Sequence, residues 1–63
     1  MWIKLTDRNH GPIYINFSLV TDFMRYPGDG HTTVFLNSNS EGKVRVIHVN
    51  ETPDEIFSSF GKL

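Results

Sequence analysis

The 63-residue sequence contains no cysteine. Disulfide bonds and thiolate metal sites are therefore excluded, although small domains often depend on such supports. No apolar run approaches the 18 or so residues of a membrane-spanning helix, and the N-terminus reads as a strand rather than as the apolar stretch of a signal peptide. We therefore expect a cytoplasmic protein.

The charge is almost balanced. Six Lys and Arg residues against seven Asp and Glu residues give a formal net charge of −1, so the net charge favours neither nucleic acid nor an anionic membrane as a partner. A hydrophobic content of 38% with 13% aromatic residues is typical of a folded chain. The length allows one domain, over residues 1–63, and a domain of this size buries only ~60% of the surface of its unfolded chain.

Short β-type segments separated by turn residues dominate the sequence. The predicted strands cover Trp2–Thr6, residues 13–17, residues 19–26, Thr32–Asn37 and Lys43–Val49. Turn residues separate them at 9–12, 27–30 and 37–42. The pattern predicts a mainly β fold with one short C-terminal helix: a four- to five-stranded antiparallel meander or small half-barrel that oligomerises through a sheet face or edge.

The C-terminal segment changes to a helical pattern. Thr52 and Glu55 have the spacing of a capping box, and Pro53 occupies the first helical position, so we expect a helix at about 53–60. A helix of about two turns is not stable alone. We expect it to dock on the sheet through Ile56, Phe57 and Phe60.

The strands are apolar on both faces. Simple alternation places one set of large side chains under the helix: Ile3, Leu5, Ile13, Ile15, Phe17 and Phe23. A second set points the other way: Trp2, Tyr14, Val20, Met24 and Tyr26. In the fifth strand Val44 and Val46 share one face, and Ile47 and Val49 share the other. A bulge near residues 46–47 would explain why this strand is apolar on both faces.

One short helix covers only one face, and contiguous uncovered apolar area usually marks an interface. Trp2, Tyr14, Val20, Met24 and Tyr26 are therefore the candidate interaction residues, and a homo-oligomer is the expected assembly. The alternative is that the sheet curls and partly buries both sets.

Enzymatic chemistry finds no support in the sequence. His10, His31 and His48 lack the close spacing of zinc ligands, and no serine or threonine sits in a nucleophile elbow. We expect no catalytic, cofactor-binding or metal-binding residues. The expected function is that of a small regulatory or protein-interaction module that is not an enzyme.

RNA binding is the alternative function. Lys4, Lys43 and Arg45, with aromatic rings available for stacking, could form a surface for single strands. Interspersed carboxylates such as Asp22 and Glu41 weaken the positive electrostatic field of these cations.

The chain resembles the small bacterial FlbD/SwrD-type flagellar and swarming-motility proteins. The matching positions are Ile3, Leu5, Thr6, Asn9, Gly11, Tyr14, Asn16, Val20, Thr33, Val34, Leu36, Gly42, Val49, Glu51, Glu55 and Ile56. The resemblance implies a cytoplasmic role connected with motility, and it implies no catalytic residues.

The chain also resembles the carbon storage regulator (CsrA) family, whose members are strand-swapped dimers that bind messenger RNA. The likeness lies in the opening Ile3-Lys4-Leu5-Thr6 and in the entry to the helix, Val49 to Phe57. The family's basic positions fall on or near Asp7 and Glu51 here, and a carboxylate repels a phosphate backbone. The resemblance therefore implies a similar architecture more strongly than RNA binding.

Overall fold

The computed structural model describes residues 1–37 and 43–60 of the chain. Five strands precede one helix: β1 (Trp2–Asp7), β2 (Gly11–Asn16), β3 (Val20–Met24), β4 (Thr32–Asn37), β5 (Val44–Val49) and α1 (Pro53–Phe60). The predicted mainly β fold with a short C-terminal helix is confirmed. Most of the turn predicted at 37–42 lies outside the described residues.

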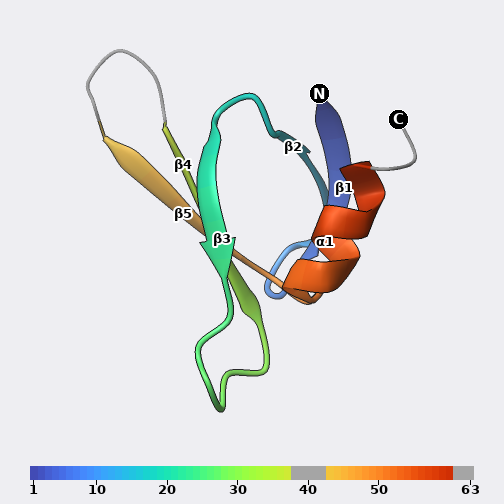
Figure 1. Cartoon of the computed structure of the whole chain (residues 1–63), viewed down its shortest axis with the longest axis vertical. Coiled ribbons are helices and arrows are strands. Elements are labelled where there is room, and N and C mark those ends of the chain that lie inside the picture. The colour runs from blue at the N-terminus through green and yellow to red at the C-terminus, as the bar shows by residue number, and fades with distance from the viewer. Residues whose placement is uncertain (38–42, 61–63) are drawn as a thin grey trace.

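All five strands belong to one antiparallel sheet in the order β2-β1-β5-β4-β3. A simple meander would place β2 beside β3, but these consecutive strands form opposite edges of the sheet. Only residues 17–19 connect them, and so short a link spans at most about 14 Å. The sheet must therefore bend strongly to bring its edges together, and Figure 1 shows β1 and β5 diverging from a common lower end while β3 crosses in front. The sheet remains open.

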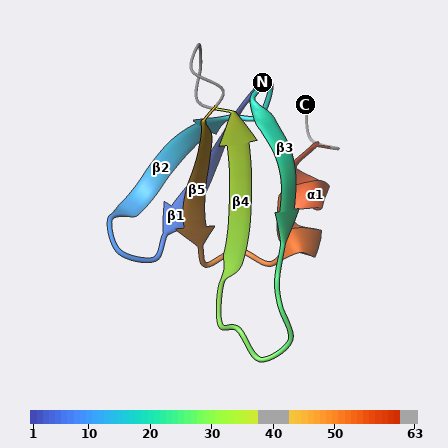
Figure 2. The ribbon, with the colours of Figure 1, turned by 90° about the vertical axis from the view of Figure 1, so that its left-hand side faces the viewer.

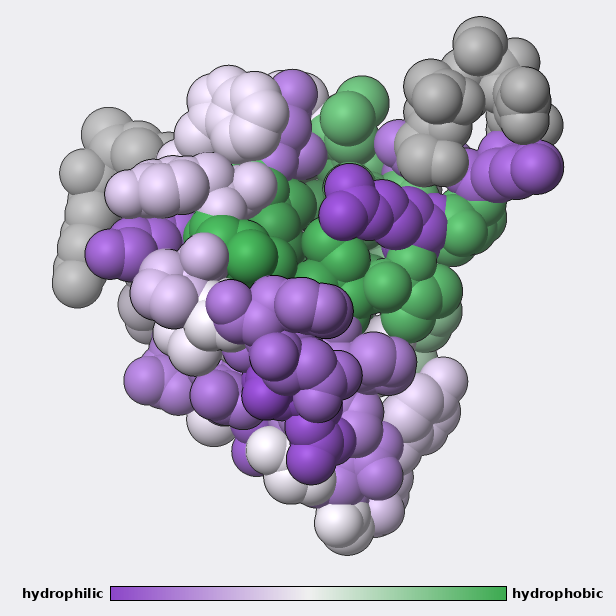
Figure 3. Space-filling model, turned by 180° about the vertical axis from the view of Figure 1, so that it is seen from behind, coloured by the Kyte–Doolittle hydropathy of each residue, from purple (hydrophilic) through white to green (hydrophobic). Residues whose placement is uncertain are grey.

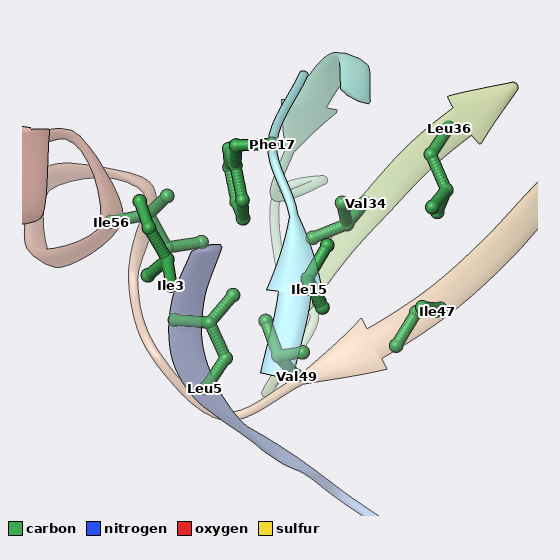
Figure 4. Close-up of a cluster of buried hydrophobic side chains, with 9 residues drawn as sticks. All are labelled: Ile3, Leu5, Ile15, Phe17, Val34, Leu36, Ile47, Val49 and Ile56. Atoms are coloured by element: carbon green, nitrogen blue, oxygen red, sulfur yellow. The ribbon is translucent and has the colours of Figure 1, made fainter. Parts of the chain in front are cut away.

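The core fills the concave side of this bent sheet. Its fully or nearly fully buried members come from β1, β2, β4, β5, α1 and the β2–β3 link: Ile3, Leu5, Ile15, Phe17, Val34, Leu36, Ile47, Val49 and Ile56. Figure 4 shows these side chains converging from opposite sides of the bend. The first predicted set therefore forms much of the core, as alternation requires.

The helix is held by its cap and by aromatic rings. The Thr52 amide donates to Glu55 Oε1 at 2.9 Å and the Glu55 amide donates to Thr52 Oγ1 at 3.1 Å, so the predicted capping box is present. The Phe60 ring lies edge-on to Phe17, with centroids 5.5 Å apart. Figure 2 shows α1 beyond the β3 edge of the strands β3, β4 and β5.

The prediction that Phe57 docks on the sheet is wrong. Ile56 is fully buried, whereas 69% of Phe57 is exposed. Adjacent residues are rotated by about 100° around a helix. Ile56 and Phe60 therefore lie on one face of α1, and Phe57 points away from that face. Among the described aromatic rings Phe57 contacts only Phe60, with centroids 5.8 Å apart.

A β-bulge changes the faces of β3. The pairing with β4 shifts between Val20 and Asp22, and the Thr21 hydroxyl donates to the Phe35 carbonyl at 3.2 Å. The extra residue turns both Val20 and Phe23 toward the core, where they are partly buried. The outward placement of Val20 is therefore wrong, because simple alternation fails across a bulge.

The bulge suggested for the fifth strand is absent. The β4–β5 register runs without a shift from Thr32↔Val49 to Asn37↔Val44. Ile47 and Val49 are buried, while Val44 and Val46 are 59% and 46% exposed. Regular alternation therefore holds in β5, and its outer face carries the apolar Val44 and Val46 followed by His48.

Candidate functional site

A groove of about 710 Å³ lies between the β1–β2 hairpin and β5. It exists because β1 pairs with β5 only at Asp7↔Val49, after which the two strands diverge. The groove is lined by Trp2, Asp7, His10, Ile13, Tyr14, Ile15, Asn16, Leu19, Leu36, Arg45 and Ile47. Figure 3, seen from behind, shows hydrophobic surface at the centre of this side with hydrophilic residues around it.

Two aromatic side chains stand at the rim of the groove. Trp2 is 66% exposed and Tyr14 is 68% exposed. The register pairs Trp2 with Asn16 and Lys4 with Tyr14, so the two rings lie diagonally across one face of the hairpin. Two of the five predicted interaction residues therefore meet at the groove.

The other three predicted residues lie elsewhere. Met24 and Tyr26 are exposed in β3 and in the loop after it, away from the groove lining. Val20 packs against the core. The predicted interaction face is thus divided between separate parts of the molecule, because the sheet bends and β3 carries a bulge.

Sequence reasoning missed a second apolar area, on the outer face of β4 and β5. Val46 lies directly opposite Phe35, and Val44 follows on the same face. These two valines are exposed, and Phe35 is partly exposed. The signal for this area in the sequence was the alternation of Val44 and Val46 with Ile47 and Val49.

One end of the groove is polar. Asp7 Oδ1 accepts hydrogen bonds from the amides of Asn9, at 2.8 Å, and His10, at 3.0 Å. The Asn9 amide, with further help from the His10 ring and amide, lowers the pKa of Asp7. The Asp7 carboxylate therefore makes its hydrogen bonds within its own turn.

Arg45 is the remaining charged side chain of the groove. It is exposed, and no carboxylate pairs with it among the described residues. The groove therefore combines an apolar lining, two aromatic rings, the Asp7 carboxylate at one end and a guanidinium, Arg45, that bonds to no carboxylate among the described residues. Such a surface suits recognition of an apolar side chain beside a carboxylate.

The three cations proposed for RNA do not meet in one place. Lys4 lines a separate depression of about 400 Å³ together with Glu51, Asp54 and Glu55. Arg45 lines the groove, and Lys43 precedes β5. Lys4 therefore lies among carboxylates rather than beside the other two cations.

Comparison with known proteins identifies no relative of the chain. No family model, curated protein or solved structure matches the chain. Within residues 1–37 and 43–60, no three His, Asp or Glu side chains are grouped so that they could hold a metal ion. No helix in the same part of the chain is long and apolar enough to cross a membrane.

Proposed function

We propose that the chain is a non-enzymatic protein-interaction module that binds its partner through the groove between the β1–β2 hairpin and β5. The observation that carries this proposal is the open apolar groove with Trp2 and Tyr14 exposed at its rim. Tyr, Trp and Arg are enriched in protein interfaces, and all three occur here. A module of this kind acts by what it binds, which is the action of a regulatory or adaptor protein.

A second copy of the chain is the partner that the charges favour. The groove carries Arg45, which pairs with no carboxylate in residues 1–37 and 43–60, while the first turn of α1 carries Asp54 and Glu55. Beside these acids stands Phe57, 69% of which is exposed. An aromatic anchor next to a carboxylate is the complement of an apolar groove next to a guanidinium.

In this proposal Phe57 of each copy enters the groove of the other, and Asp54 approaches Arg45. Reciprocal contacts of this kind close a two-fold dimer. Full burial of a phenylalanine side chain contributes about 1.5–3 kcal/mol, and the dimer would bury two of them. The resemblance to motility proteins indicates where further partners are best sought.

The protein-interaction proposal is preferred over RNA binding. A single-strand surface needs cations that follow the strand, together with stacking rings. Lys4 lies with Glu51 and Asp54, whereas Arg45 lies across the hairpin in the groove.

Charge exchange tests the dimer. Sedimentation equilibrium at micromolar concentration is expected to give about twice 7.2 kDa for the natural chain. Arg45→Glu and Asp54→Lys should each shift the mass toward the monomer, and the double variant should restore the dimer. Phe57→Ser should also dissociate it, whereas the matched change Val46→Ser, on an exposed side chain outside the groove, should not.

Trp2 supplies a second readout, because it is the only tryptophan of the chain and stands at the groove. Its emission should shift to longer wavelength on dilution of the natural chain and should not depend on the concentration of Arg45→Glu. A natural chain that sediments as a 7.2 kDa monomer overturns the second copy as partner. A dimer that persists in Phe57→Ser and Arg45→Glu shows that the groove is not the interface.

A further inference from the structure

A cluster of nitrogen-bearing side chains lies at the end of the sheet where β1 and β5 meet. Arg8 Nη1 is 2.5 Å from His31 Nδ1, and the His31 and His48 rings are edge-on with centroids 4.7 Å apart. These side chains come from the β1–β2 turn, the residue before β4 and the end of β5. The tertiary fold alone brings them together.

The backbone fixes this cluster in place. The Arg8 amide donates to the His48 carbonyl at 3.0 Å, so the residue is anchored beside β5. His48 Nδ1 is 3.4 Å from the hydroxyl of the buried Thr33, its cross-strand partner. The exposed Arg8 and the half-buried imidazoles are thus held by residues of the sheet.

The contacts determine which ring nitrogens are available to a ligand. A guanidinium only donates hydrogen bonds, so His31 Nδ1 must accept, and the proton of the neutral ring resides on Nε2. In His48, Nδ1 faces the Thr33 hydroxyl, which can donate or accept, so this contact leaves Nε2 without a partner but does not fix the ring proton. Both rings therefore have Nε2 free of protein partners among the described residues.

This arrangement favours an anion over a metal ion. A metal at His31 Nε2 would require the ring proton on Nδ1, where it would oppose the Arg8 donor. No carboxylate bonds to Arg8, His31 or His48 within residues 1–37 and 43–60. In the described part of the chain, the cluster thus combines the positive charge of Arg8 with the Nε2–H donor of His31 and has no carboxylate bonded to it, in a chain whose net charge is −1.

We propose that Arg8, His31 and His48 form a binding site for a phosphate group. The guanidinium provides the fixed charge and paired N–H donors that match phosphate oxygens. The Nε2–H of His31 supplies a further donor, and the His48 ring lies edge-on beside it. The site is independent of the groove, because none of the three residues lines it.

The test is a titration of the full chain with inorganic phosphate, with chloride holding the ionic strength constant. The imidazole Cε1 proton resonances report binding at each histidine. His31 and His48 are expected to shift along one saturating curve, while His10, an exposed histidine bonded to Asp7, should not follow it. His10 therefore serves as an internal control.

Substitutions identify the donors. Arg8→Ala keeps the amide that bonds to His48, and it should weaken phosphate affinity at least about tenfold, because it removes a charge-assisted contact. His31→Gln should also weaken binding. Arg45→Ala removes the same charge from the groove and should leave the affinity unchanged, and Arg8→Lys should recover only part of it.

The source of the phosphate is distinguished by two further probes. A single-stranded oligothymidylate that displaces phosphate, with affinity falling steeply as salt rises, would identify a nucleic-acid backbone. A nucleoside monophosphate that binds where the oligonucleotide does not would identify a small phosphorylated ligand. Parallel shifts of all three histidines, equal affinity of Arg8→Ala, or saturation by Zn²⁺ instead of phosphate would each overturn the proposal.

Discussion

Two valines of β5 offer a direct test of the bent sheet. Val49 is fully buried and pairs with Thr32 on one side and Asp7 on the other, whereas Val44 is 59% exposed. Val→Ala at either position makes the same chemical change in the same strand. The two variants therefore differ mainly in burial and in the contact between β1 and β5.

The expected cost follows from the core packing. Val49→Ala removes two methyl groups, worth about 0.8 kcal/mol each, and leaves a cavity that raises the total to about 2–3 kcal/mol. A cysteine-free domain of this length is expected to have only about 3–5 kcal/mol of stability. The buried substitution should therefore remove about 40% of it or more, while Val44→Ala should cost less than about 1 kcal/mol.

Urea unfolding followed by far-UV circular dichroism measures both variants at one low protein concentration. The urea midpoint of Val49→Ala should fall far below that of the natural chain, and that of Val44→Ala should stay close to it. Equal losses in the two variants would refute the placement of Val49 at the junction of β1 and β5. A large loss for Val44→Ala alone would place the core on the other face of β5.

The remaining predictions concern the cap and acid stability. Thr52→Ala should lower the free energy of unfolding by about 1 kcal/mol in urea melts, while Thr52→Ser, which keeps the capping hydroxyl, should lose much less. Amide donors lower the pKa of Asp7, chiefly Asn9, and that of Glu55, chiefly Thr52, in the folded chain. A carboxyl group whose pKa is lower in the folded chain than in the unfolded chain stabilises the fold at pH values above its ordinary pKa. This contribution is lost as the pH falls through the pKa of the folded chain. Urea midpoints should therefore decline below about pH 5, and Asp7→Asn or Glu55→Gln should each flatten that decline; an unchanged slope in both variants would contradict the assignment.

The junction of β1 and β5 connects the groove, the cluster of Arg8 with the two histidines, and the helix. The Thr6 amide and hydroxyl both donate to the Glu51 carboxylate at 2.9 Å, and the Thr32 hydroxyl donates to the Glu51 carbonyl at 2.6 Å. The segment leading into α1 is therefore tied to both β1 and β4. Because β1 meets β5 only here, one small region sets the angle at which the groove opens.

The candidate site was only partly predictable from the sequence. Trp2 and Tyr14 were identified because hairpin strands alternate regularly, and the register keeps both on the outer face. Val20 was misplaced because one inserted residue reverses the faces of β3 from that point, and no residue type marks the bulge. Arg45 was noticed for its charge, but its place in the groove depends on a strand that is remote in the sequence.

The sequence by itself determined the local features of this protein: the strand segments, the capping box of Thr52 and Glu55, the buried Ile56 and the mainly β class. These depend on period, turn chemistry and hydrogen bonds between near neighbours, which are written into short stretches of chain. The tertiary structure decided that β1 lies beside β5, that Phe57 faces outward, and that Arg8, His31 and His48 meet. Such placements depend on pairing between distant strands, because many registers satisfy the same local pattern and only packing of the whole core selects one of them.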